Sequence, residues 1–115
     1  MYTYEVTKVR RVVDGDTIEV TVDLGFRIFH NITVRLLGIN APEARTKDLE
    51  EKAKGLEAKD FLRIYMDDNK NSFMTVDSIK LDSFGRSLGD VFVDGENLSD
   101  LMLREGHAVP YSSKS

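Results

Sequence analysis

Residues 17–24 constrain the fold most strongly, because their side chains alternate strictly between polar and apolar. Successive side chains of an extended chain point to opposite sides, so the apolar ones share one face: Ile18, Val20, Val22 and Leu24. This pattern predicts an antiparallel strand with one buried face. The sequence Asp-Gly-Asp at 14–16 precedes the strand and is typical of a turn.

Four other segments carry weaker versions of the same signal and are predicted to be strands: residues 4–13, 28–37, 73–81 and 88–93. In the segment after the first hairpin, apolar side chains at even positions share one face, which places Arg35 on the other. The alternation changes parity between Val76 and Ile79, which predicts a β-bulge or a bend.

Two helices are predicted. The first covers residues 48–67, where Asp48 and Glu51 resemble a capping box and apolar residues follow at helical spacing despite Gly55. The second is the sequence NLSDLMLREG at 97–106, which is bounded by an Asn N-cap and a Gly C-cap.

The elements follow the order three strands, one helix, two strands, one helix. This order predicts an α+β fold dominated by β-structure: a five-stranded OB-fold barrel with a helix between strands 3 and 4 and a C-terminal helix. A chain of 115 residues with 41% apolar content is long enough to close one core, so residues 1–111 are expected to form a single domain. The polar tail at 112–115 is expected to be disordered.

The overall charge restricts how this chain can meet a polyanion. Its net charge of −4 and pI near 5.1 exclude the broad basic surface of a sequence-independent DNA binder. A polyanion would have to be met by a local cluster, for which the candidates are Lys8, Arg10, Arg11, Arg35, Arg45, Lys47 and Arg86. Each of these side chains taken alone is more commonly solvated surface.

Several functional classes are disfavoured by what the sequence lacks. The chain has no cysteine, which excludes disulfides, thiolate metal sites and a Cys nucleophile. Neither His30 nor His107 has a zinc-binding spacing. No segment reaches the roughly 20 apolar residues of a membrane span, and the N-terminus lacks a signal-peptide pattern. We expect a soluble chain, either cytoplasmic or already processed and secreted, of undetermined oligomeric state.

Four pieces carry residue types that bind phosphate or a hard cation: DGDT at 14–17, Arg35, NAPE at 40–43 and DSFGR at 82–86. Each segment alone is weak evidence for such a site, because DGDT is typical of a hairpin turn and an acid or arginine in a loop is commonly exposed. Their combination in this order on this strand pattern is specific.

The set resembles the staphylococcal nuclease family. The family's strings are matched by DGDT, by RLLGINAPE at 35–43 and by FGR at 84–86, and its closing helix by LMLREGHA at 101–108. The resemblance extends from about Val6 to Ala108.

The resemblance implies a calcium site. Its ligands would be the side chains of Asp16 and Asn40 and the backbone carbonyl of Ala41, with Asp14 close behind them. The family usually has Asp where this chain has Asn40, and Thr where it has Ala41. An amide keeps an oxygen ligand but removes one charge, so calcium binding is expected to be weaker.

The resemblance also implies which residues bind the phosphate and which residue acts on the attacking water. Arg35 and Arg86 would clamp the phosphate, because a planar guanidinium matches two phosphate oxygens, and Glu43 would orient or deprotonate the attacking water. Phe84 stands where relatives often have Tyr, so it is expected to contact substrate without a phenolic hydrogen bond. Tyr111 is expected to supply the missing contact to substrate.

Together these features imply a calcium-dependent endonuclease that hydrolyses DNA and RNA, in single-stranded or unpaired regions, to 3'-phosphate products. The alternative is a catalytically weak or inactive module of the same fold that binds nucleic acid or a protein. A third, weaker interpretation is an oligosaccharide-binding OB domain.

The hairpin at 25–31 is longer than in the best-known family member and carries Phe26, Phe29 and His30. These rings could stack on bases or pack against the barrel. Core packing is the favoured prediction for a Phe in a strand.

Overall fold

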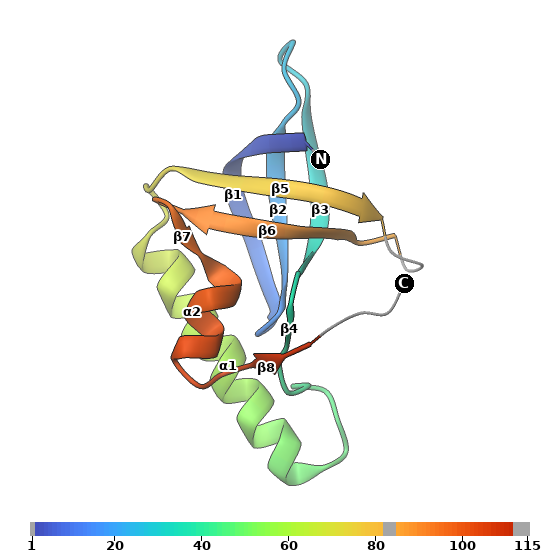
Figure 1. The fold of residues 1–115 in the computed structure, drawn as a ribbon, viewed down its shortest axis with the longest axis vertical. Helices are drawn as coiled ribbons and strands as arrows, with labels where there is room; N and C mark the ends of the chain where they lie inside the picture. Colours follow the sequence, from blue (N-terminus) through green and yellow to red (C-terminus); the bar gives the residue numbers. More distant parts are fainter. Residues whose placement is uncertain (1, 82–84, 112–115) are drawn as a thin grey trace.

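Five long strands close into a barrel in the computed structural model, which describes residues 2–81 and 85–111 (Figure 1). They are β1 (Tyr2–Asp14), β2 (Thr17–Asp23), β3 (Phe29–Leu36), β5 (Met74–Leu81) and β6 (Ser87–Val93). Antiparallel pairing gives the order β3-β2-β1-β5-β6, and a parallel pairing of β3 with β6 closes the barrel. The predicted OB-type α+β fold is therefore confirmed.

The barrel interior is filled by the apolar face that the alternation predicted. Ile18 and Val20 on β2 are fully buried, as is Val34 on β3, and the polar side chains between them are more exposed. Burial of such side chains stabilises the fold by about 1.5–3 kcal/mol each. Between Ser78 and Lys80 the pairing of β5 with β6 shifts register, which confirms the predicted bulge.

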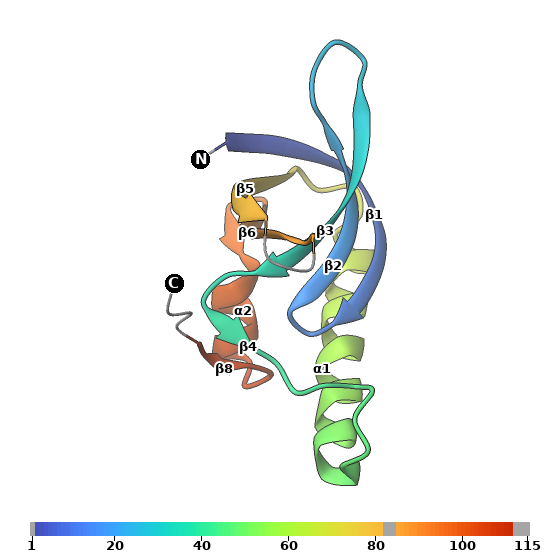
Figure 2. The same cartoon turned by 90° about the vertical axis from the view of Figure 1, so that its right-hand side faces the viewer.

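The two helices in the described part of the chain are α1 (Leu49–Asp68) and α2 (Leu98–Arg104). Helix α1 lies along the β1 side of the barrel and buries one stripe of small and apolar residues (Figure 2). Helix α2 begins at the predicted Asn97 N-cap. It ends in a Schellman motif, in which the His107 and Gly106 amides donate to Met102 and Leu103 and Gly106 has φ +77°.

Three two-residue strands were not predicted: β4 (Ile39–Asn40), β7 (Glu96–Asn97) and β8 (Val109–Pro110). Strand β7 pairs with β6 and leads into α2. Strands β4 and β8 pair with each other and tie the C-terminal segment to the loop after β3. Within the described residues, neither helix is long and apolar enough to cross a membrane.

The prediction that the rings of the β2–β3 hairpin pack against the core is wrong. Phe26 is 97% exposed and Phe29 57%, and His30 is also exposed. The hairpin extends beyond the barrel in both views, so no second layer covers it (Figures 1 and 2). At its tip Phe26 and Arg27 adopt positive φ angles of 55° and 60°, which non-glycine residues adopt at a cost.

Asp90 on β6 gives the fold a pH-dependent weakness. It is paired across the sheet with Asp77, and the Asn97 side-chain amide donates to it at 3.4 Å. Burial raises the pKa of the Asp90 carboxyl, the Asn97 bond lowers it, and the Asp77 and Asp100 carboxylates raise it further. The native state therefore holds this proton more tightly than the unfolded state, and stability falls as pH rises from the ordinary Asp range through the raised value.

Asp90→Asn should raise the melting temperature at pH 7, because it removes a half-buried charge that faces other carboxylates. The gain should shrink at pH 4, because the pKa of Asp90 is raised and more of the native carboxyl is protonated there than at pH 7. Thermal unfolding by circular dichroism at both pH values measures this difference. Glu5→Gln, at an exposed position on β1, serves as the control, and an equal gain from both variants at both pH values would contradict the assignment.

Candidate active site

Four of the predicted site residues lie together where β2 begins and β3 ends: Asp16, Arg35, Asn40 and Ala41. Thr17 pairs with Arg35 across the two strands, and the Leu36 amide donates to the Asp16 carbonyl at 2.8 Å. The β1–β2 turn thus lies beside the loop that leaves β3 and enters β4 (Figure 2). The sheet register brings the first and second motifs together.

Asp16 is a buried carboxylate with a fixed orientation. Its side chain accepts a hydrogen bond from the Thr17 hydroxyl at 2.9 Å through Oδ1 and from the Ala41 amide at 2.9 Å through Oδ2. Only 7% of the residue is exposed. These two donors fix the orientation of a carboxylate that is largely shielded from solvent.

Arg35 joins the same carboxylate to the loop after β3. Its Nη1 donates to the carbonyls of Leu36 and Ile39 at 2.9 Å each, and its Nη2 donates to Asn40 Oδ1 at 3.2 Å. The same Nη2 lies 3.4 Å from Asp16 Oδ2, with 14% of the Arg35 side chain exposed. One guanidinium therefore gathers the carboxylate, the amide and two backbone carbonyls.

The strand pair β4–β8 holds Asn40 from the other side. Asn40 is the pairing partner of Val109, and two residues further on the Tyr111 amide donates to the Gly38 carbonyl at 2.9 Å. Gly38 has φ +80°, a conformation that favours glycine. The backbone of Tyr111 is thereby placed next to the loop, and its ring is about half exposed.

The loop that carries Glu43 is held by two acids. The Glu43 amide donates to Glu51 Oε2 at 3.2 Å, and the Ala44 amide donates to Asp14 Oδ1 at 3.4 Å. The predicted capping box is therefore only half formed. Asp48 caps α1 as expected, but the Glu51 carboxylate binds the Glu43 amide instead of returning to Asp48.

Two glycines allow this loop to approach the helix. A Cβ at Gly55 would lie 2.3 Å from the Glu43 carbonyl oxygen and 2.6 Å from the Ala44 amide nitrogen. At Gly15 it would lie 2.9 Å from the Cβ of Ala58 and 3.0 Å from that of Ala41. The glycine inside the helical pattern of α1 thus has a packing reason.

Arg86 enters the site region from β6. It directly precedes Ser87, the parallel partner of Val34, so its backbone lies beside the strand that carries Arg35. The residue is partly buried. Phe84, also predicted to contact substrate, lies outside the described residues.

The oxygen atoms gathered here suit a hard cation better than zinc. Asp16 Oδ2 and Asn40 Oδ1 both lie within reach of Arg35 Nη2, and the Ala41 backbone is bonded to Asp16. Among the described residues no group of three His, Cys, Asp or Glu side chains could hold a metal. Any ion here would depend on an amide and a backbone carbonyl besides a carboxylate, a mixture that calcium accepts.

Sequence reasoning missed the residues that support this site. Glu51 was interpreted as a helix cap, and nothing local distinguishes a cap from an acid that binds a loop amide. Gly55 gave a detectable signal, because a glycine within a helical pattern often marks close backbone approach.

Comparison with known proteins gives consistent matches. The family model described as staphylococcal nuclease homologue matches residues 33–115. Thermonuclease of Staphylococcus hyicus is 31% identical over 101 residues, which are 88% of this chain and 56% of that protein.

Two further relatives show the same partial coverage. Protein ParB of Escherichia coli is 33% identical over 113 residues, covering 90% of this chain and 56% of that protein. Endonuclease YhcR of Bacillus subtilis is 30% identical over 109 residues, covering 90% of this chain but 9% of that protein. The chain thus spans about half of two of these relatives and a small part of the third.

Gly55→Ala should push the 43–44 backbone away from α1 and destabilise the protein by about 1–3 kcal/mol, as overpacking does. Hydrogen exchange of the Ala41 and Ala44 amides should become faster than global unfolding explains. The control is Ala53→Gly at an exposed position of the same helix, which costs about 1 kcal/mol of helix propensity without moving the loop. Equal exchange rates in the two variants, after correction for stability, would refute the packing role.

Proposed function

Because the chain belongs to the staphylococcal nuclease family, we propose that it is a calcium-dependent nuclease that hydrolyses phosphodiester bonds of DNA and RNA. The observation that carries this proposal is the convergence of Asp16, Arg35 and Asn40 at one guanidinium nitrogen. A buried carboxylate, an oxygen-rich loop and a guanidinium together suit a phosphate and a hard cation. The nuclease names of the relatives support the same substrate class.

Asp16, Asn40 and the Ala41 carbonyl would hold the cation. A bound hard cation supplies charge neutralisation at the phosphate. Asp16 is oriented for this by its bonds from Thr17 and Ala41, which leave further carboxylate lone pairs for a ligand. Cation binding by Asp16 would therefore require no movement of the β1–β2 turn.

Arg35 would bind the phosphate with the edge of its guanidinium that makes no bond to the backbone of the described residues. Nη1 is committed to two backbone carbonyls, whereas in the described part of the chain Nε donates to no protein atom. Nε and Nη2 form the edge that binds two oxygens in parallel. Phosphate binding would then exchange the 3.2 Å bond to Asn40 for one to substrate.

Arg86 would supply a second guanidinium from the start of β6, and Phe84 and Tyr111 would contact the substrate nearby. Charge on a transferring phosphoryl group spreads over several oxygens, so donors on two elements can follow it better than one. The pairing of β6 with β3 supports this placement of Arg86.

Glu43 would orient or deprotonate the attacking water. It is exposed, and the bonds from its own amide to Glu51 and from the Ala44 amide to Asp14 fix its backbone. A general base on a fixed backbone loses less freedom when it meets its water. We propose 3'-phosphate products and a preference for single-stranded or unpaired substrate.

A second candidate function rests on Asn40. Replacement of a charged ligand by an amide would weaken cation binding, and a module with weak catalysis could still bind nucleic acid or a protein. The first function is favoured because Arg35, Glu43 and Arg86 are all present.

Glu43→Gln should lower kcat for DNA by about 10²–10⁴-fold, the usual contribution of a general base, without change in melting temperature. Cleavage of a fluorogenic single-stranded DNA measures this. Glu50→Gln on the exposed first turn of α1 is the matched control and should keep full activity. Turnover of Glu43→Gln at the control rate would remove Glu43 from the mechanism.

Cleavage should require calcium and stop with EDTA, and Asn40→Asp should restore a charged ligand. We expect Asn40→Asp to lower the calcium concentration for half-maximal activity by about tenfold, because ligand charge sets calcium affinity. Calcium titrations of both proteins test this. Activity that persists in EDTA, or an identical calcium requirement in the variant, would contradict the proposed ligands.

A further inference from the structure

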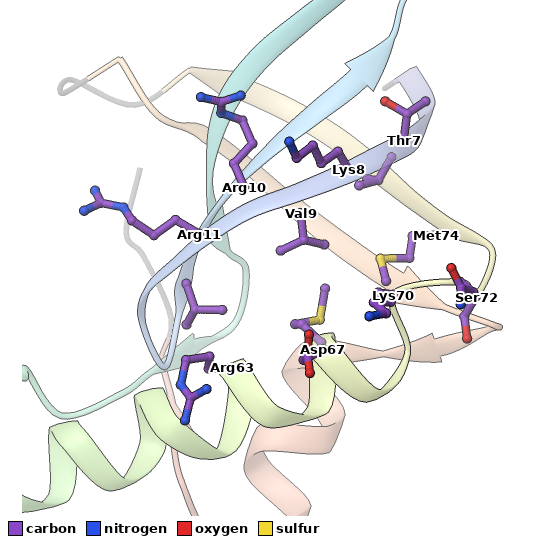
Figure 3. Close-up of a pocket in the computed structure, with 14 residues that line it drawn as sticks. Thr7, Lys8, Val9, Arg10, Arg11, Arg63, Asp67, Lys70, Ser72 and Met74 are labelled. Carbon is purple, nitrogen blue, oxygen red and sulfur yellow. The ribbon is translucent and has the colours of Figure 1, made fainter.

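A second concave region lies between β1 and the C-terminal half of α1, away from the loop described above (Figure 3). Its volume is about 450 Å³. One wall is the middle of β1, and the other is α1 with the turn that follows it. We call it the β1–α1 groove.

The β1–α1 groove is strongly basic in an acidic chain. Five cations line it: Lys8, Arg10, Arg11, Arg63 and Lys70. Asp67 is the one acid in its lining, although the whole chain carries a net charge of −4. Lys8, Arg10 and Arg11 belong to β1, Arg63 belongs to α1, and Lys70 lies in the turn that follows α1 (Figure 3).

Most of this charge is available to a ligand. Arg11 pairs with Glu19 at 2.6 Å and Arg63 with Asp60 at 3.1 Å, and both pairs are solvent-exposed. Exposed ion pairs add little stability, so a phosphate can replace the acid. Across residues 2–81 and 85–111, Lys8, Arg10 and Lys70 have no side-chain ion pair or hydrogen bond.

The groove is connected to the candidate active site by β1 itself. The strand passes through the groove at Val6–Val12 and ends in the turn that presents Asp16. From Val9 to Asp14 the chain covers roughly 15–20 Å at the usual rise of a strand. OB folds bind about 4–16 nucleotides of a single strand, so one strand can reach both places.

We propose that the β1–α1 groove binds the phosphate backbone of the nucleic-acid substrate at nucleotides away from the bond that is cleaved. This inference rests on the proposed function for the identity of the polyanion. The groove would add affinity for long strands and contribute nothing to the hydrolysis of a small phosphodiester. Local positive charge would thereby offset the unfavourable net charge of the chain.

The test compares two double variants with the same loss of charge. Lys8→Gln/Lys70→Gln removes one cation from each wall, and Arg27→Gln/Lys52→Gln removes two exposed cations outside the groove. Binding of a fluorescein-labelled single-stranded DNA is measured by anisotropy in EDTA at several KCl concentrations. Cleavage of the same strand and of a small chromogenic phosphodiester is measured with calcium.

Each phosphate contact to single-stranded DNA contributes about 0.7 to the slope of log K against log salt. The groove variant should therefore have a slope that is smaller by about 1.4. Counted from a salt concentration one decade higher, where both proteins bind about equally, its binding at 0.1 M KCl should be roughly 10- to 30-fold weaker. Its rate on the small substrate should equal that of the wild type. The control variant should change neither slope nor rate.

An unchanged slope in the groove variant, or an equal loss in the control, would overturn the inference. The inference would also be overturned if the wild type bound phosphatidylserine vesicles more strongly than DNA and only the groove variant lost this binding. The occupant of the groove would then be a membrane. Failure of the wild type to hydrolyse the small substrate would overturn the proposed function instead, since the binding measurement requires no catalysis.

Discussion

The ion pair between Arg35 and Asp16 is the interaction on which the site depends. It joins the turn after β1, the end of β3 and the start of β4 through side chains, beside the backbone bond from Leu36 to Asp16. Both side chains are nearly buried, so loss of either would leave an uncompensated charge, a cost of several kcal/mol. The Asn40 amide and the Ala41 backbone receive their positions from this pair.

Much of the barrel could be predicted because period-two alternation reports a buried face directly. The same rule failed at Leu24 and Ile28, which continue the alternation but are exposed in a hairpin that no other layer covers. Alternation states which side chains share a face, but not whether that face has a partner. The parallel closure of β3 on β6 and the two-residue strands were also missing, since short pairings leave no periodic signal.

The motif residues of the site were predictable and their supports were not. Asp16, Arg35 and Asn40 were identified from the sequence, and the register of β2 with β3 brings them together. The supports depend on contacts between distant segments. Glu51 is a plausible cap until the loop at Glu43 approaches it, and Gly55 marks an unusual position in a helix without indicating which backbone occupies the missing Cβ position.

The distribution of charge explains how an acidic protein can be suited to a polyanion. Acids gather in a different concave region from the β1–α1 groove. It lies beside the first half of α1 and is lined by Asp48, Glu50, Glu51 and Glu57. The cations gather at the other end of the same helix and along β1. Salt screens exposed charges beyond about 8 Å at physiological ionic strength, so the two regions act nearly independently. A strand of phosphates at the β1–α1 groove would therefore respond to the local cations, and the net charge of −4 would mainly slow its approach at low salt.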